Sequence, residues 1–95
     1  PFLHNGSVPT LAQLLDSSTR PAIWRRLDYD STHFDEQAIG WPHEELMVPQ
    51  DEAPAAERKH IYDTQHWSQD NGGHRYGDAL SDSERTALLE YLKTL

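Results

Sequence analysis

The histidines are the side chains of this sequence whose chemistry and spacing first suggest a site. Three of them, His60, His66 and His74, follow one another at intervals of six and eight residues. Zinc sites use closer and more regular spacings of Cys and His, so this series matches no compact zinc motif. Acids stand beside two further histidines, in HFDE (33–36) and HEE (43–45), but such clusters are typical of solvated surface. The histidine pattern therefore does not favour a metal site built by this chain alone.

His74 differs from the other histidines in its neighbours. Gly72 and Gly73 precede it, and glycine lets a backbone approach a flat group closely. Tyr76 and Gly77 then lead toward the end of the chain. Two interpretations stay open from the residues alone: an imidazole presented to a large planar ligand, or a surface histidine that follows a turn.

Nucleophilic catalysis has little support in the sequence. The chain has no cysteine, and none of its serines lies in a Gly-x-Ser-x-Gly motif. Ser7 follows a glycine, but a role in a turn or a helix cap explains it better. A hydrolase is therefore not favoured.

Two helices are expected near the ends of the chain. Leucines recur at helical spacing in TLAQLL (10–15), which predicts a short helix from about residue 9 to 16. The motif SDSE (81–84) has the form of a capping box, and apolar residues follow it at helical spacing. A terminal helix is therefore predicted over about residues 81–94.

The long stretch between these helices, residues 17–80, shows neither sustained alternation nor a helical stripe. Four prolines interrupt it, while aromatic anchors such as Trp24 and Trp41 distinguish it from a disordered segment. We expect a segment with little regular secondary structure, whose aromatic side chains pack it onto another part of the protein. A short extended segment is expected near KHIYDTQHW (59–67). The predicted fold class is mainly α with long irregular loops.

Composition and charge limit what the chain can be. Only 36% of its 95 residues are hydrophobic and the mean hydropathy is -0.82, which predicts a thin core completed by something outside the chain. The formal net charge of -8 argues against nucleic acid as a partner. No apolar run is long enough to predict a membrane span. Because the chain opens at Pro1, we expect a processed product or a fragment.

Two stretches together resemble a known family. FLHNGSVPTLAQLL (2–15) and NGGHRYGDALSDSERTALLEYLKTL (71–95) are similar to the C-terminal part of di-haem c-type cytochromes of the bacterial cytochrome c peroxidase superfamily. Within that superfamily the rubber-oxygenase-like branch is the closer match. The looser middle elements of its pattern stand here as Arg20-Pro21, Trp24, Phe34-Asp35 and Ile39-Gly40.

The resemblance implies a fold and a cofactor. Residues 1–95 would be the C-terminal segment of one cytochrome c-like domain, not an autonomous fold, and would pack around haem c. The sixth iron ligand would be His74, with Met47, the only methionine, as its rival. The remaining cofactor-binding residues that the resemblance implies are Gly73, Arg75, Tyr76, Trp41 and His4. His4 would act structurally, and Arg25, Arg26 or Arg75 would suit the haem propionates.

One departure from the family matters for partners. Covalent haem c attachment needs Cys-x-x-Cys-His, and this chain has no cysteine. The attachment motif is therefore expected on an upstream segment or on another chain, and a redox partner protein is also possible. The resemblance implies a bacterial protein exported to the periplasm or beyond.

The leading hypothesis is a haem-pocket segment of a di-haem oxidoreductase, either a peroxidase or an oxygenase. One alternative is a segment of an electron-transfer cytochrome without substrate chemistry. Another is a binding or interaction module that keeps the fold without haem. The motifs before Pro1 and the haem absorbance of the native protein would separate these three.

Overall fold

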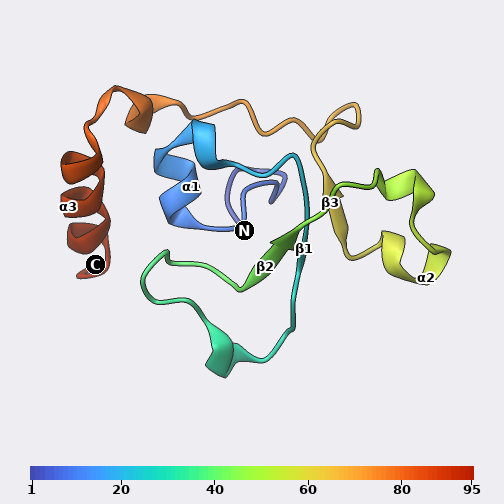
Figure 1. Cartoon of the computed structure of the whole chain (residues 1–95). Coiled ribbons are helices and arrows are strands. Elements are labelled where there is room, and N and C mark those ends of the chain that lie inside the picture. Colours follow the sequence, from blue (N-terminus) through green and yellow to red (C-terminus); the bar gives the residue numbers. More distant parts are fainter.

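Three antiparallel strands form a small sheet in the computed structural model, which describes residues 1–95 (Figure 1). The central strand is β1 (Ile23–Arg26). It pairs with β2 (His43–Glu45) on one side and with β3 (Ile61–Asp63) on the other. The strand order β2-β1-β3 joins segments that are far apart in the sequence.

The core of the sheet is built around one tryptophan. Trp24 is only 2% exposed, and its ring stacks on that of Tyr62 with centroids 4.4 Å apart. The two residues are partners in the β1–β3 register. The Trp24 indole N–H also donates to the carbonyl of Ser7 at 2.9 Å. The other buried hydrophobic side chains are Val8, Ile23 and Ile61.

Three short helices complete the fold: α1 (Leu11–Leu15), α2 (Ala55–Arg58) and α3 (Asp82–Leu92). The capping box predicted before the last helix is present, because Ser81 and Glu84 each bond to the other's backbone N–H. Helix α3 packs beside α1, away from the sheet (Figure 1). No helix has both the length and the apolar character needed to cross a bilayer.

Single turns of 3-10 helix link these elements. They lie at Ser17–Thr19, Ser31–His33, Gln50–Glu52 and Tyr76–Ala79. The last of these touches α1, and the chain reaches it by passing over α1 on its way from the sheet to α3 (Figure 1).

The prediction of a mainly α segment without a fold of its own is wrong. The chain forms a compact small domain in which 35% of residues are helical and 16% lie in strands or bridges. The stretch 17–80, expected to be irregular, contains all three strands. These strands have only three or four residues each, too few for an alternating pattern to appear in the sequence. In β1 the two buried residues are consecutive, because Ile23 and Trp24 are both covered.

Candidate functional site

His74 is exposed and lies between β3 and the 3-10 turn Tyr76–Ala79. This part of the chain passes over α1 on its way from the sheet to α3 (Figure 1). The backbone of His74 is left-handed, with φ of 52°, a conformation that costs a residue with a side chain roughly 1–2 kcal/mol. The ring meets Tyr76 edge-on at a centroid distance of 6.0 Å and has no hydrogen-bond partner in the chain. The imidazole is therefore presented outward with both nitrogens free.

The glycine before His74 is not explained by this chain's own packing. A methyl group added at Gly73 would meet no atom within 4 Å, and Gly73 does not have a positive φ. Neither crowding nor backbone conformation therefore requires glycine at this position. Its missing side chain leaves room for a group that approaches from outside the domain.

Two polar contacts and one close approach hold the segment just beyond His74. The carboxylate of Asp78 accepts hydrogen bonds from the backbone N–H of Ser17 at 2.8 Å and from its hydroxyl at 2.5 Å. These bonds lower the pKa of Asp78 below its ordinary value, the side-chain bond more than the backbone bond. Gly77 is buried, and a methyl group there would collide with the carbonyl of Leu15. The backbone at Gly77 therefore lies directly on the end of α1.

Arg20 holds the part of the segment that contains His74. Its guanidinium donates to the carbonyls of Asn71, Gly73 and His74 at 2.5, 2.6 and 2.8 Å. Burial lowers the pKa of Arg20, although arginine stays protonated at any physiological pH. Arg20 was expected only as part of an Arg-Pro motif, because nothing in its local sequence indicates these distant carbonyls.

The other predicted residues of this segment are also exposed. Arg75 donates from Nε to the carbonyl of Gly72 at 3.1 Å and has no carboxylate partner. Tyr76 is 87% exposed. Together with Gly73 and His74, they form an open polar and aromatic surface that the chain itself does not cover.

Trp41 lies in a different part of the molecule. Its ring meets Phe34 edge-on at 5.1 Å, and the guanidinium of Arg26 sits over it at 3.8 Å from the centroid. It lines a cavity of about 60 Å³ that contains none of the residues around His74. The structure therefore does not bring Trp41 together with the His74 segment.

His4 and Met47 are both exposed. The residue after His4, Asn5, donates to the carbonyl of Asp70 at 3.1 Å, which ties the N-terminal turn to the chain leading to His74. Met47 is 94% exposed and lines a hollow of about 290 Å³ without His74. Of the other residues suggested for the site, only Arg25 lines that hollow.

Two of the arginines suggested for propionates have other contacts. Arg25 forms an ion pair with Glu44, its cross-strand partner in β2. Arg26 stacks between the rings of Trp41 and Tyr29 and makes no ion pair. Arg75 is therefore the candidate that lies next to His74.

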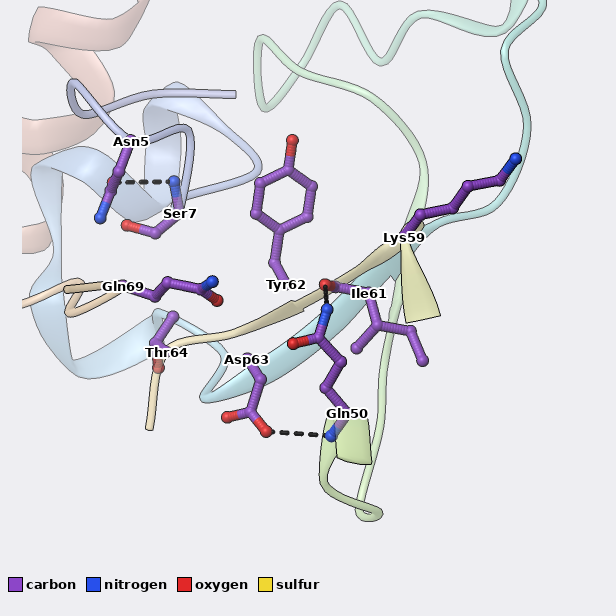
Figure 2. Close-up of a pocket in the computed structure, with 9 residues that line it drawn as sticks. All are labelled: Asn5, Ser7, Gln50, Lys59, Ile61, Tyr62, Asp63, Thr64 and Gln69. Carbon is purple, nitrogen blue, oxygen red and sulfur yellow. Dashed lines mark hydrogen bonds between the residues drawn. The ribbon is translucent and has the colours of Figure 1, made fainter. Parts of the chain in front are cut away.

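A polar cavity of about 390 Å³ beside β3 was not expected from the sequence (Figure 2). Its buried carboxylate, Asp63, accepts from the backbone N–H groups of Gln50 and Gln65, each at 3.0 Å. The Gln50 side-chain amide donates to the carbonyl of Ile61 at 3.1 Å (Figure 2). These hydrogen bonds pair the polar groups with one another and join β3 to the turn at Gln50. The residues around the cavity therefore serve the scaffold.

The histidines do not assemble a metal centre in this chain. His66 Nε2 lies 3.6 Å from Asp51 and 3.5 Å from Asp63, whose carboxylate already accepts hydrogen bonds from two backbone N–H groups. No group of three or more His, Asp or Glu side chains is placed to hold a metal ion.

The residues around His74 fit one side of a haem and do not enclose one. A neutral imidazole is a common haem ligand, and the open space at Gly73 would let a flat group approach. None of the cavities of the chain includes His74, so these 95 residues do not form a closed haem pocket. The chain has no cysteine, so covalent attachment does not occur here.

The first 25 residues match a family described as RoxA-like, cytochrome c-like. Residues 1–25 thus resemble a cytochrome c-like region of the rubber-oxygenase-like type. The match includes α1 together with Ser17 and Arg20, the elements that hold the His74 segment. It supports haem c as the class of cofactor.

A curated relative extends the similarity along the chain. The uncharacterized protein y4iJ of Sinorhizobium fredii (strain NBRC 101917 / NGR234) is 33% identical over 106 aligned residues. The alignment covers all of this chain and 15% of that protein. The chain therefore spans less than a sixth of the relative's length.

Proposed function

We propose that this chain supplies one wall of a haem c site and the sixth iron ligand, His74, in a di-haem oxidoreductase of the peroxidase or oxygenase type. The observation that carries this proposal is an unpartnered, outward-facing imidazole on a left-handed backbone, next to a glycine that the chain itself does not require. Leu3, Ile39 and Ser68 also have a positive φ, so the unpartnered imidazole, more than the backbone, distinguishes His74. The cytochrome c-like match of residues 1–25 supports the choice of haem as the ligand.

The proposed roles follow from side-chain chemistry. A ring nitrogen of His74 would donate its lone pair to the iron, and the open side of Gly73 would accept the approaching macrocycle. The guanidinium of Arg75, free of any carboxylate, would suit a propionate. Trp41 and His4 lie outside this segment, and the proposal does not depend on them.

Haem would supply the redox chemistry, and its binding to two imidazoles would give a lower potential than binding to one imidazole and one thioether. This chain would contribute the ligand, the shielding of one haem face and the charge near the propionates. Met47 remains the rival ligand, but its hollow contains neither Gly73 nor His74.

The proposal implies partners outside these residues. A segment or chain with Cys-x-x-Cys-His would carry the covalently bound haem, and a redox protein would exchange electrons with it. Because cytochrome c-like proteins of bacteria are exported, we place the complete protein in the periplasm or outside the cell.

Electron transfer without substrate chemistry is the second candidate function. It is favoured by the absence of any carboxylate or second histidine among residues 71–77, which leaves Tyr76 as the one side chain beside the ligand that could act as a general acid or base. Turnover of peroxide by the complete protein would support the oxidoreductase role, whereas reversible reduction without turnover would support electron transfer.

Absorption spectra of the complete protein test the ligand assignment. His74→Ala is expected to replace a six-coordinate, low-spin spectrum by a high-spin one in the Soret and α-band regions, because the iron loses its sixth ligand. Met47→Leu serves as the comparison and is expected to leave both bands unchanged. Unchanged bands in His74→Ala, or lost low-spin bands in Met47→Leu, would remove His74 from the iron.

A further inference from the structure

We propose that Arg20 is the positioning residue of His74: its guanidinium fixes the backbone from Asn71 to His74 on α1 and so sets the direction of the imidazole. The inference rests on the proposed role of His74 as an iron ligand. Its structural part, the fixing of the backbone by one side chain, can be measured with or without haem.

On the side of the segment, Arg20 binds three carbonyl groups within four residues. Nη1 donates to Asn71 at 2.5 Å and to Gly73 at 2.6 Å, and Nη2 donates to His74 at 2.8 Å. The segment has no helix or strand from residue 71 to 75, so it lacks the regular backbone pairing that would fix its shape. Arg20 supplies most of that fixation, and the Asn71 amide adds one bond to the carbonyl of Pro21 at 3.1 Å.

On the opposite side, the same guanidinium binds the end of α1. Nε donates to the carbonyl of Gln13 at 3.0 Å, and Nη2 donates to that of Leu14 at 2.9 Å. The last carbonyls of a helix have no partner within the helix, so they are available to an arginine. Arg20 therefore links the unpaired end of α1 to the unpaired backbone of the His74 segment.

A guanidinium is suited to this role and an ammonium is not. Arginine carries five N–H donors in a rigid planar fork, whereas lysine has three donors on a single nitrogen. The bonds of Arg20 reach five carbonyls in two separate segments. No carboxylate takes part, so the contact depends on donor geometry more than on charge pairing.

The left-handed backbone of His74 explains why this fixation would matter for function. A residue with a side chain keeps φ of 52° only where its surroundings hold it there. The carbonyl of His74 is held by Arg20, while its side chain makes no hydrogen bond. Release of the carbonyl would let the residue relax to a negative φ and turn the imidazole away.

Loss of Arg20 is expected to act locally. The next residues are anchored independently, because Asp78 binds Ser17 and the backbone of Gly77 lies on Leu15. The hydrogen bond and the stacking of Trp24 in the core involve Ser7 and Tyr62, not Arg20. The domain should therefore fold in Arg20 variants while residues 71–74 loosen.

The test compares Arg20→Gln and Arg20→Lys with Arg58→Gln in the complete protein. Arg58 is a matched control, since its guanidinium also donates to a backbone carbonyl, that of Ala53 at 2.9 Å, but in α2 and outside the His74 segment. Amide hydrogen exchange is measured over residues 71–76 and over the three strands, together with the Soret spectrum and the electron paramagnetic resonance of the iron.

In both Arg20 variants the amide hydrogens of residues 71–76 are expected to exchange about tenfold faster or more, because several charge-assisted hydrogen bonds are lost. The exchange rates of the three strands are expected to stay unchanged. The iron is expected to show a mixture of low-spin and high-spin signals, whereas Arg58→Gln is expected to match the wild type in both measurements. Full rescue by Arg20→Lys would overturn the argument from the guanidinium fork.

The outcomes separate the two proposals. If Arg20→Gln exchanges and absorbs like the wild type while His74→Ala changes the spectrum, the role of Arg20 is overturned and the proposed function stands. If Arg20→Gln loosens the segment but neither variant changes the spectrum, the iron-ligand role fails and only the backbone contact is supported. If hydrogen exchange became equally faster in the three strands, Arg20 would be a residue that stabilises the whole domain, and its positioning role would be overturned.

Discussion

The sheet and the His74 segment hold their shapes in opposite ways. In the sheet, Trp24 is buried, its ring stacks on Tyr62 and its indole N–H donates to a carbonyl, so no part of this side chain is left to bind another molecule. In the segment the side chains of His74 and Tyr76 are exposed, and Arg20 fixes the backbone instead. The difference shows how a domain with few buried residues can be stable in one region and still present an unpaired imidazole in another.

The largest expected effect is on the sheet. Trp24→Ala should lower the free energy of unfolding by about 3–5 kcal/mol, because it removes a large buried ring and leaves a cavity. Trp67→Ala is the matched control: this ring is 94% exposed, and the loss should stay within about 0.5 kcal/mol. Urea unfolding followed by circular dichroism measures both. Similar losses in the two variants would break the contrast between a packed sheet and an open surface.

Gly73 and Gly77, which lie before and after His74, extend the comparison between packed and open regions to the segment itself. Gly77→Ala should cost about 1–3 kcal/mol, since its methyl group would collide with the carbonyl of Leu15. Gly73→Ala should change stability by less than about 0.5 kcal/mol, because nothing lies within 4 Å of the added carbon. In the complete protein, Gly73→Ala should nevertheless reduce the low-spin fraction of the haem. A fully low-spin Gly73→Ala would argue that no group approaches this glycine.

The cap of α3 tests whether the helix supports the segment. Ser81→Ala should lower stability by about 1 kcal/mol through loss of the bond to the Glu84 N–H. Arg85 of α3 donates to the carbonyls of Gly77 and Leu80, so faster hydrogen exchange should extend to Gly77. Ser83→Ala, with no bond to an N–H group, should have a smaller effect on both measurements. If the faster hydrogen exchange of Ser81→Ala were confined to α3, the His74 segment would depend on α1 alone.

The smallest effect is the pH dependence from Asp78. Its pKa lies below the ordinary value of 3.8 because Ser17 donates two hydrogen bonds to its carboxylate. A lowered folded-state pKa gives stability that is fully present above the unfolded value and is lost as the pH falls through the folded one. Ser17→Ala should therefore lose less stability than the wild type between about pH 5 and pH 2. Parallel acid unfolding curves for the two proteins would contradict this linkage.

Local patterns predicted some of these features and missed others. SDSE located the cap of α3, and the leucines of residues 10–15 indicated the helix that the structure places at Leu11–Leu15. The same approach indicated the extended segment that contains β3 (59–67) but missed β1, β2 and the pairing of the three strands, because each strand is very short and its partners lie far along the chain. For the candidate site, the glycines singled out His74, but no local signal indicated Arg20.

The sequence by itself determined the features that depend on neighbouring residues. Capping at Ser81 acts over three positions, and the lack of cysteine excludes covalent haem attachment without reference to any fold. The tertiary structure decided which groups Arg20 binds, 51 to 54 residues away. Its acceptors are backbone carbonyls, which every residue carries, so residue type cannot identify them. Only the path of the chain over α1 brings those carbonyls to the guanidinium.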